Sequence, residues 1–473
     1  MNTTEAPKLA RSLSLVQATA INMIDMVGIG PFIVISSIVG LLGGTASLLA
    51  WLLGALLAFV DGMVWAEMGA KWPEAGGSFV FLQKLFPGRW GRRMAFLFTW
   101  QTSIQAPLVV ASAALGFAKY LRYLVPLESV GGRLFGHFDW QIGTAHFTDA
   151  DVGARIASGG VVLLMTLLLY RNIKSIGRLS VVLWMITGGT LIWIIASGLP
   201  HFSPHIFSGG STAPASWMSL AFMAALGAAS QKAVYSYLGY YNVCHLGAEI
   251  KNPARNIPRA IFISVGGIAL LYLGMQLAVL SVLPSAVIAN SDFVVSDFFS
   301  QLYGPVIAKI ATGLILCIAL ASLFSVLLGY SRVPYAAAKE GLFFPAFARL
   351  HPRLQIPHVS LLFLGGLGFV FSLLFRMGEV ISAIIVMRIL VQFVAQAVGV
   401  MAWRVRLPGD VRPYRMPLYP LPALLSIAIW LFIFCTSGRY FILGALGIIG
   451  IGAILFEFLP RPPKDAPARL PES

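Results

Sequence analysis

Long apolar segments separated by short polar loops dominate the pattern of this chain. Each segment is close to or above the roughly 20 residues that a helix needs to cross the hydrocarbon core of a bilayer. The pattern therefore predicts an all-α integral membrane protein with 12 transmembrane helices. The predicted spans cover residues 14–42, 45–70, 93–125, 153–171, 176–199, 217–248, 259–283, 305–337, 358–376, 379–405, 421–438 and 440–459.

The first span contains a predicted break near its middle. Gly28 and Gly30 weaken a helix there, and Pro31 lacks the amide hydrogen needed to continue it. Broken backbone at membrane depth is tolerated only where it faces protein or a water-filled cavity. An acid, Asp25, lies one turn before the break. These features predict a substrate site near the membrane midplane.

The sixth span has a second predicted interruption, at residues 235–242. This stretch reads YSYLGYYN and places polar groups, aromatic rings and Gly239 at membrane depth. The two interrupted spans are five apart and therefore run in opposite directions. Broken helices in corresponding positions of two inverted halves are typical of secondary transporters.

Loop charges predict the orientation of the chain. With the N-terminus in the cytoplasm, 24 of the 33 Lys and Arg residues fall on the cytoplasmic side and seven on the outer side. This bias predicts a multi-pass protein of the cell membrane with both termini cytoplasmic. The longest outer loop, residues 126–152, is expected to hold short interfacial helices, and the Pro-rich tail after residue 460 to be disordered.

Composition narrows the function classes. The chain is 58% hydrophobic and 11% charged, with a mean hydropathy of +0.83, which excludes a soluble enzyme. The net charge of +15 lies in loops and does not form a nucleic-acid-binding face. The seven histidines show no metal-binding spacing such as HExxH. We therefore expect no enzyme activity, no cofactor and no metal, and the predicted partners are the lipid bilayer and a small-molecule substrate.

Four motifs spread along the chain resemble those of amino acid permeases of the amino acid–polyamine–organocation superfamily. The segment GIGPF resembles that family's G-S-G-I-F break, and EIKNPARNIPRA resembles the signature after its sixth helix. AEMGAKWPEAGG and SRVPYAAAKEG resemble the ends of its second and eighth helices. These motifs occupy residues 28–32, 249–260, 66–77 and 331–341, respectively.

The resemblance implies a five-plus-five inverted repeat of the LeuT type with helices 1 and 6 interrupted. It divides the chain into a cytoplasmic N-terminal segment, two repeats of five helices, two peripheral helices and a cytoplasmic tail. These parts cover residues 1–13, 14–199, 217–405, 421–459 and 460–473.

The chain also departs from the family pattern. Pro31 replaces the usual isoleucine, a change similar to the polyamine-transporting branch. A lysine of helix 5, which stands in for a sodium ion in many members, is replaced here by Thr187 or Gly188. Tyr240 and Tyr241 occupy positions often held by Trp or Asn in amino acid exchangers.

The restarted half of helix 1 would present free backbone amides at its N-terminus, which suit a substrate carboxylate. The resemblance independently assigns the carboxylate to this stretch. It also implies a gating aromatic at Tyr235 and substrate-contacting backbone around Ser236 and Gly239. The alternative is a glycine-lined packing contact between helices. The candidate substrate-binding residues are Asp25, Val27, Gly28, Ile29, Gly30, Gln101, Gln105, Tyr235, Ser236, Gly239, Tyr240 and Tyr241.

Asp25, Lys232 and Arg388 lie inside predicted spans and are expected to face the bundle interior. Asp25 has several open roles: it could bind a substrate amine, accept a coupling proton, pair with Arg388 or Lys232, or face a water-filled vestibule. Lys232 is either a coupling group or a snorkelling side chain. For Arg388 a structural ion pair is favoured.

Ser322 and Ser325 occupy the part of helix 8 where hydroxyls help to build a sodium site in sodium-coupled relatives. Serines are also common at packed membrane interfaces, so a proton is favoured over sodium as the coupling ion.

The function predicted from the sequence is secondary active transport of amino acids by alternating access, with substrate held between the unwound parts of helices 1 and 6. The alternative is a proton-coupled polyamine or organic-cation transporter of the same fold. A channel is disfavoured because the sequence shows no filter motif.

Overall fold

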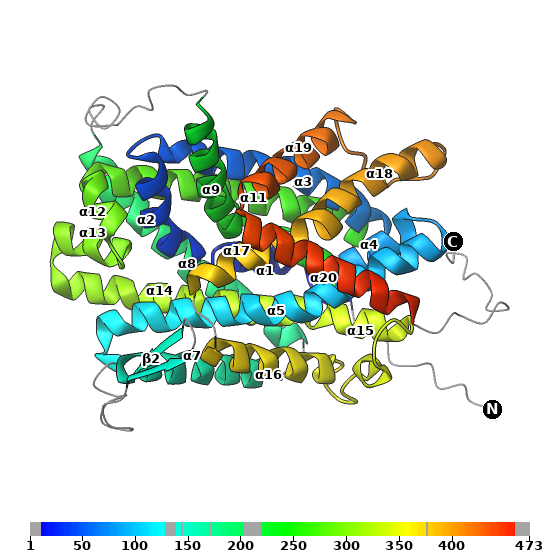
Figure 1. Cartoon of the computed structure of the whole chain (residues 1–473), viewed down its shortest axis with the longest axis horizontal. Coiled ribbons are helices and arrows are strands. Elements are labelled where there is room, and N and C mark those ends of the chain that lie inside the picture. The colour runs from blue at the N-terminus through cyan, green and yellow to red at the C-terminus, as the bar shows by residue number, and fades with distance from the viewer. Residues whose placement is uncertain are drawn as a thin grey trace.

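The structure is a computed structural model that is almost entirely helical. The long helices α5 (Gly88–Leu124), α14 (Pro305–Tyr330) and α16 (His358–Leu374) run nearly parallel along the long axis and pack on one another (Figure 1). It describes residues 11–127, 139–142, 145–170, 173–202, 219–374 and 377–458.

Helices occupy all twelve of the predicted segments. The first half contains α1 (Leu15–Met26), α2 (Gly30–Leu42), α3 (Ser47–Lys71), α4 (Ser78–Leu85), α5, α7 (Asp149–Leu168), α8 (Ile173–Gly198) and the 3-10 helix η1 (Leu199–His201). The second half contains α9 (Leu220–Tyr237), α10 (Asn242–His245), η3 (Gly247–Glu249), α11 (Pro253–Val282), α12 (Ser285–Asn290), α13 (Val294–Tyr303), α14, α15 (Arg332–Lys339), η4 (Pro345–Ala348), α16, α17 (Met377–Arg388), the π-helix η5 (Ile389–Val394) and α18 (Ala395–Arg406). The chain then continues into α19 (Leu421–Thr436) and α20 (Arg439–Glu457).

Several helices are suited to cross a membrane. Within the described residues, seven are long and apolar enough to do so, and the bent pair α1 and α2 raises that number to eight. Shorter apolar helices such as α16 and α19 lie between them in the sequence. The chain is therefore a multi-pass membrane protein.

Part of the loop between α5 and α7, where the sequence predicts short interfacial helices, forms strands instead. Two short antiparallel strands, β1 (Asp139–Ile142) and β2 (Ala145–Thr148), form a hairpin directly before α7. Alternating polar and apolar residues such as those of DWQI suit a strand better than a short helix. Residues 128–138 and the predicted disordered tail lie outside the described residues.

Polar contacts hold the start of α1 in place. The Ser14 hydroxyl accepts a hydrogen bond from the Gln17 amide at 3.4 Å, and the Gln17 side chain accepts one from the Ser14 amide at 2.9 Å. This capping box satisfies donors that the first turn of a helix leaves free. Just before it, the Ser12 and Leu13 amides donate to the Glu249 carbonyl, each at 2.9 Å. The segment that leads into α1 is therefore fixed to the segment that follows the second break.

Helices from the N-terminal half of the chain pack on helices from the C-terminal half. The helix α3 contacts α11, α5 contacts α14, and α7 contacts α16. The interrupted helices meet as well, because α2 packs on α9 and α1 packs on α10. This pairing brings both breaks to one place in the interior.

Candidate functional site

Both predicted breaks are present, and they differ in form. The first lies between Met26, where α1 ends, and Gly30, where α2 begins, and the two helices are bent by 42°. Pro31 is the second residue of α2. An amide in the first turn of a helix has no partner within the helix, so a proline here removes no intrahelical hydrogen bond. The second break follows Tyr237, where α9 ends, and only the four-residue α10 continues beyond it.

Close approach of the two breaks requires glycine. Gly239 has a φ of +117°, which L side chains rarely adopt. A Cβ atom at this position would lie 2.7 Å from Asp25 Oδ2 and 2.9 Å from the Asp25 carbonyl carbon. A Cβ atom at Gly30 would lie 3.0 Å from the ring of Tyr235. Gly239 of the second break therefore lies directly against Asp25 near the end of α1. Gly30 of the first break lies directly against Tyr235 near the end of α9.

A narrow cavity lies between the breaks. The space that the centre of a water molecule can reach in it is about 50 Å³. A cavity of this size holds only a few waters. Two of its sides come from the broken helices, and the others come from α5, α14 and α17. The cavity is lined by Asp25, Met26, Gly28, Ile29, Gly30, Val109, Ala113, Tyr235, Ser236, Leu238, Gly239, Tyr241, Ser322, Val326, Tyr330, Ile384 and Arg388.

Most of the predicted substrate-site residues line this cavity, but four do not. Val27 is buried beside it. Gln101 donates to the Met387 carbonyl at 2.7 Å and so ties α5 to α17. Gln105 is buried, and its amide nitrogen has no hydrogen-bond partner within the described residues. Tyr240 turns away from the cavity and donates to Asp61 on α3.

Asp25 and Arg388 line the same cavity with opposite charges. The Arg388 guanidinium donates to the hydroxyls of Tyr241 and Tyr330, and its Nε has no partner within the described residues. None of the ion pairs among those residues joins Asp25 to Arg388 or to Lys232. The expected structural ion pair of Arg388 is therefore replaced by a tyrosine clamp. Both side chains border the cavity without a direct ion pair between them.

Tyr235 lies over the cavity from the last turn of α9. Its hydroxyl is 2.8 Å from that of Ser112 on α5, and its ring touches the space above Gly30. The hydrogen bond thus connects the broken helix to α5 across the cavity. An aromatic side chain in this position closes the cavity on one side.

Sequence reasoning missed two residues that hold the breaks together. The Tyr272 hydroxyl, on α11, lies 2.7 Å from the Met26 carbonyl and 3.0 Å from the Ser236 carbonyl, so it links the ends of α1 and α9. The Asn22 side chain, on α1, donates to the Tyr240 carbonyl at 2.6 Å and accepts from the Val243 amide at 2.8 Å. These bonds satisfy backbone groups that broken helices leave free. A lone Tyr or Asn in an apolar helix carried no local signal of this role.

The two candidate sodium-site serines lie in different surroundings. Ser322 lines the cavity beside Gly28. The Ser325 hydroxyl donates to the Ile21 carbonyl at 2.9 Å and accepts from the Asn242 side chain at 2.9 Å. Ser325 therefore helps to fix α14 to both broken helices.

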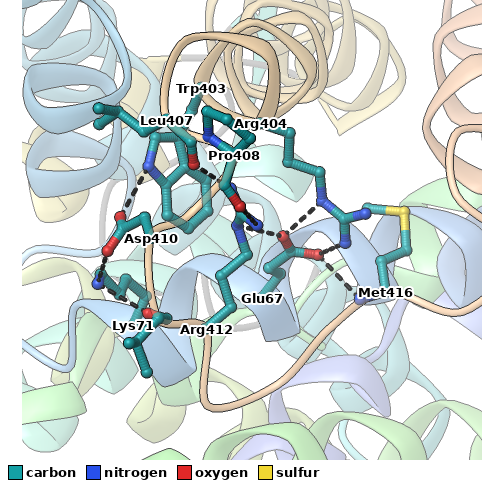
Figure 2. A network of polar contacts seen from close by, with 10 residues as sticks. Glu67, Lys71, Trp403, Arg404, Leu407, Pro408, Asp410, Arg412 and Met416 are labelled. Carbon is teal, nitrogen blue, oxygen red and sulfur yellow. Dashed lines mark hydrogen bonds and ion pairs between the residues drawn. The ribbon is translucent and has the colours of Figure 1, made fainter.

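A polar network surrounds the C-terminal end of α3 (Figure 2). Glu67 is inaccessible to solvent and accepts two hydrogen bonds from Arg404 of α18 and one from the Met416 amide at 2.9 Å. One turn later, Lys71 donates to Asp410 at 2.6 Å. Burial opposes ionisation of Asp410, but the hydrogen bond and charge of Lys71 outweigh it and lower the pKa of that carboxyl. The network fastens α3 to the loop before α19.

Comparison with known proteins agrees with this arrangement. A family profile described as "Amino acid permease" matches residues 13–451. The serine/threonine exchanger SteT of Bacillus subtilis is 26% identical over 451 residues, which cover 93% of this chain and 92% of that protein. The branched-chain amino acid permease BcaP of the same organism is 24% identical, covering 96% of this chain and 94% of its own. The mouse cationic amino acid transporter 4 is 26% identical over 77% of this chain, which spans 55% of that longer protein.

The named relatives are transporters, exchangers and permeases, and none of those three is an enzyme. The match of the family profile extends over nearly the whole chain and includes both breaks and every lining residue of the cavity. The chain belongs to the amino acid permease family, within the amino acid–polyamine–organocation superfamily.

Proposed function

We propose that this chain is a secondary active transporter of amino acids that works by alternating access and holds its substrate between the breaks of α1/α2 and α9/α10. The observation that carries the proposal is the cavity between the two breaks, which is lined by helix ends, one acid and one base. Interrupted helices at the interface of two repeats form the substrate sites of known secondary transporters.

The ends of the broken helices suit a zwitterion. The amides of Gly28 and Ile29, just before α2, and of Gly30, its first residue, border the cavity and can donate to a substrate carboxylate. Asp25 lies on the last turn of α1 and can accept hydrogen bonds from a substrate ammonium group. The two ends of an amino acid would thus face complementary groups.

The charges of the cavity favour a neutral amino acid. A second positive group on the substrate would meet Arg388, and a second carboxylate would meet Asp25. The remaining wall includes Val109, Ala113 and Ile384, which suit an aliphatic or small side chain. The polyamine alternative gains support from Asp25 but is opposed by the buried Arg388.

A twelve-span architecture with two inverted repeats is part of the proposal. The repeats are residues 14–199 and 217–405, the peripheral helices lie within 421–459, and both termini lie in the cytoplasm of a cell-membrane protein. Support comes from the break near the start of each half, the matched packing of α3 with α11 and α5 with α14, and the charge bias of the loops.

Uptake assays test the proposed substrate class. We expect proteoliposomes containing the full chain to take up labelled leucine or serine, and unlabelled neutral amino acids to compete at least about tenfold better than lysine, glutamate or putrescine. The reason is that a misplaced like charge in a binding site costs several kcal/mol, and about 1.4 kcal/mol is a factor of ten. Competition by putrescine alone would favour the polyamine alternative, and flux without saturation would favour a channel.

The proposed coupling ion is a proton and not sodium. The Ser325 hydroxyl, one of the two candidate sodium ligands, is already engaged in hydrogen bonds that fix α14 to the broken helices. Uptake driven by an imposed pH gradient in sodium-free buffer supports this choice. Uptake that requires a sodium gradient contradicts it.

A further inference from the structure

A carboxylate outside the substrate cavity lies at membrane depth without a cation. Asp61 is near the middle of α3, a helix long and apolar enough to span a membrane, and it is 1% exposed. Its Oδ2 accepts a hydrogen bond from the Tyr240 hydroxyl, and its Oδ1 accepts one from the Ser426 hydroxyl at 2.7 Å. Within the described residues, no ion pair includes Asp61.

The other deeply buried carboxylates have a different environment. Glu67 and Glu249 are each held by two donors of an arginine, Arg404 and Arg332 respectively. Such pairs compensate the charge of a buried acid. Asp61 has hydroxyl and indole neighbours but no cation, so its charge is not compensated, and an isolated buried charge is costly. Among the buried acids that the structure describes outside the substrate cavity, Asp61 is therefore the one whose environment favours binding a proton.

Hydroxyl partners also suit a change in protonation. A serine or tyrosine hydroxyl can either donate or accept, whereas an arginine can only donate. When the carboxylate binds a proton, a neighbouring hydroxyl can rotate and accept the new O–H, so neither form of the site needs to leave Asp61 unsatisfied. Trp65 and Trp430, in turns adjacent to the site on α3 and α19, add two large indoles around it.

The charged groups on the helices around Asp61 lie in other environments. Lys232 is half-buried on α9, and Arg404 of α18 is bound to Glu67. Arg388 donates a hydrogen bond to the hydroxyl of Tyr241 at the cavity. The ring of Tyr241 in turn contacts the ring of Tyr240. None of these cations contacts the carboxylate, whose nearest donors are the hydroxyls of Tyr240 and Ser426 and the indoles of Trp65 and Trp430.

Tyr240 connects this carboxylate to the substrate site. It belongs to the second break, its ring contacts that of Tyr241 at a centroid distance of 5.0 Å, and its carbonyl accepts from Asn22 of α1. A hydrogen bond to a carboxylate is roughly twice as strong as one to a neutral group. Protonation of Asp61 therefore weakens the hold of α3 on the break that borders the substrate cavity.

We propose that Asp61 binds the coupling proton and that Tyr240 transmits its protonation state to the break between α9 and α10. One proton joins the carboxylate from the side of higher proton concentration and leaves it on the other side in each cycle. By linkage, substrate binding in the cavity changes the affinity of Asp61 for the proton to the same extent. Because this role rests on the proposed transport function, its test needs a readout that transport alone does not supply.

The test compares gradient-driven uptake with exchange at equal pH in proteoliposomes containing the full chain and labelled leucine or serine. We expect an acid-outside gradient to raise wild-type uptake at least about fivefold, the lower end of typical coupling energies. Asp61→Asn should lose this stimulation but retain exchange, since asparagine can still pair with both hydroxyls. Asp292→Asn, an exposed acid of a loop, is the matched control and should keep the stimulation.

Each outcome bears on one proposal. Wild-type stimulation in Asp61→Asn, or wild-type exchange without any response to the gradient, overturns the role of Asp61 and leaves amino acid transport standing. Absence of both exchange and uptake in the wild type overturns the transport function itself.

A second variant, Tyr240→Phe, tests the proposal if Asp61→Asn does not fold. It keeps the carboxylate of Asp61 and removes one hydrogen-bond donor to its charged form. The pH of half-maximal uptake should then move toward alkaline values by about one unit, which is a tenfold change in proton affinity. An unchanged pH profile overturns the proposal.

Discussion

Replacement of Gly30 by leucine should reduce amino acid uptake by about tenfold or more. A Cβ atom at this position would lie 3.0 and 3.2 Å from two ring carbons of Tyr235 and 3.4 Å from the Ser236 hydroxyl. The rest of the leucine side chain would extend into a cavity of only about 50 Å³. Overpacking costs about 1–3 kcal/mol, and about 1.4 kcal/mol changes an equilibrium tenfold. The new side chain would also cover the amides of α2 that are proposed to hold the carboxylate.

A matched control separates this effect from general damage to the fold. Gly366 lies within α16, and an added Cβ there meets no atom within 4 Å. Gly366→Leu should therefore retain uptake and elute like the wild type in size-exclusion chromatography. If Gly30→Leu also folds and transports normally, the substrate does not bind between the two breaks.

The positions of the breaks could be predicted because their causes are local. Gly28, Gly30 and Pro31 interrupt the first span through their own backbone chemistry, and Gly239 does so in the sixth through a positive φ. The resemblance to a known family then placed both breaks in one site. Most residues of the resulting cavity were therefore accessible from the sequence.

The partners of individual side chains could not be predicted in the same way. Tyr240 and Tyr241 are adjacent in the sequence, yet one points to Asp61 and the other to Arg388 at the cavity. Which of two neighbouring tyrosines faces a cavity depends on how the unwound segment turns, and this is set by tertiary contacts. The Tyr330 clamp on Arg388 and the Tyr272 bridge come from helices distant in sequence, so no local pattern indicates them.

The network around Glu67 should be sensitive to loss of one partner. Glu67 is inaccessible to solvent, and Arg404 supplies two of its hydrogen bonds, while Arg412 lies 3.8 Å away. We expect Arg404→Ala to lower the free energy of unfolding by about 3–5 kcal/mol, because it leaves a buried carboxylate without its main partner. The result should appear as a large loss of thermal stability in detergent micelles.

The comparison pair is Arg89 and Glu457, whose side chains are 56% and 47% exposed. Arg89→Ala should cost about 0–1 kcal/mol, since solvent already screens an exposed ion pair. Arg404→Lys provides the finer test, because lysine keeps the charge but cannot form the two-pronged contact with Glu67. If Arg404→Lys is as stable as the wild type, charge alone holds α3 to the loop before α19. If it falls between Arg404→Ala and the wild type, the paired hydrogen bonds drawn in Figure 2 carry part of the stability of the contact between α3 and the loop before α19.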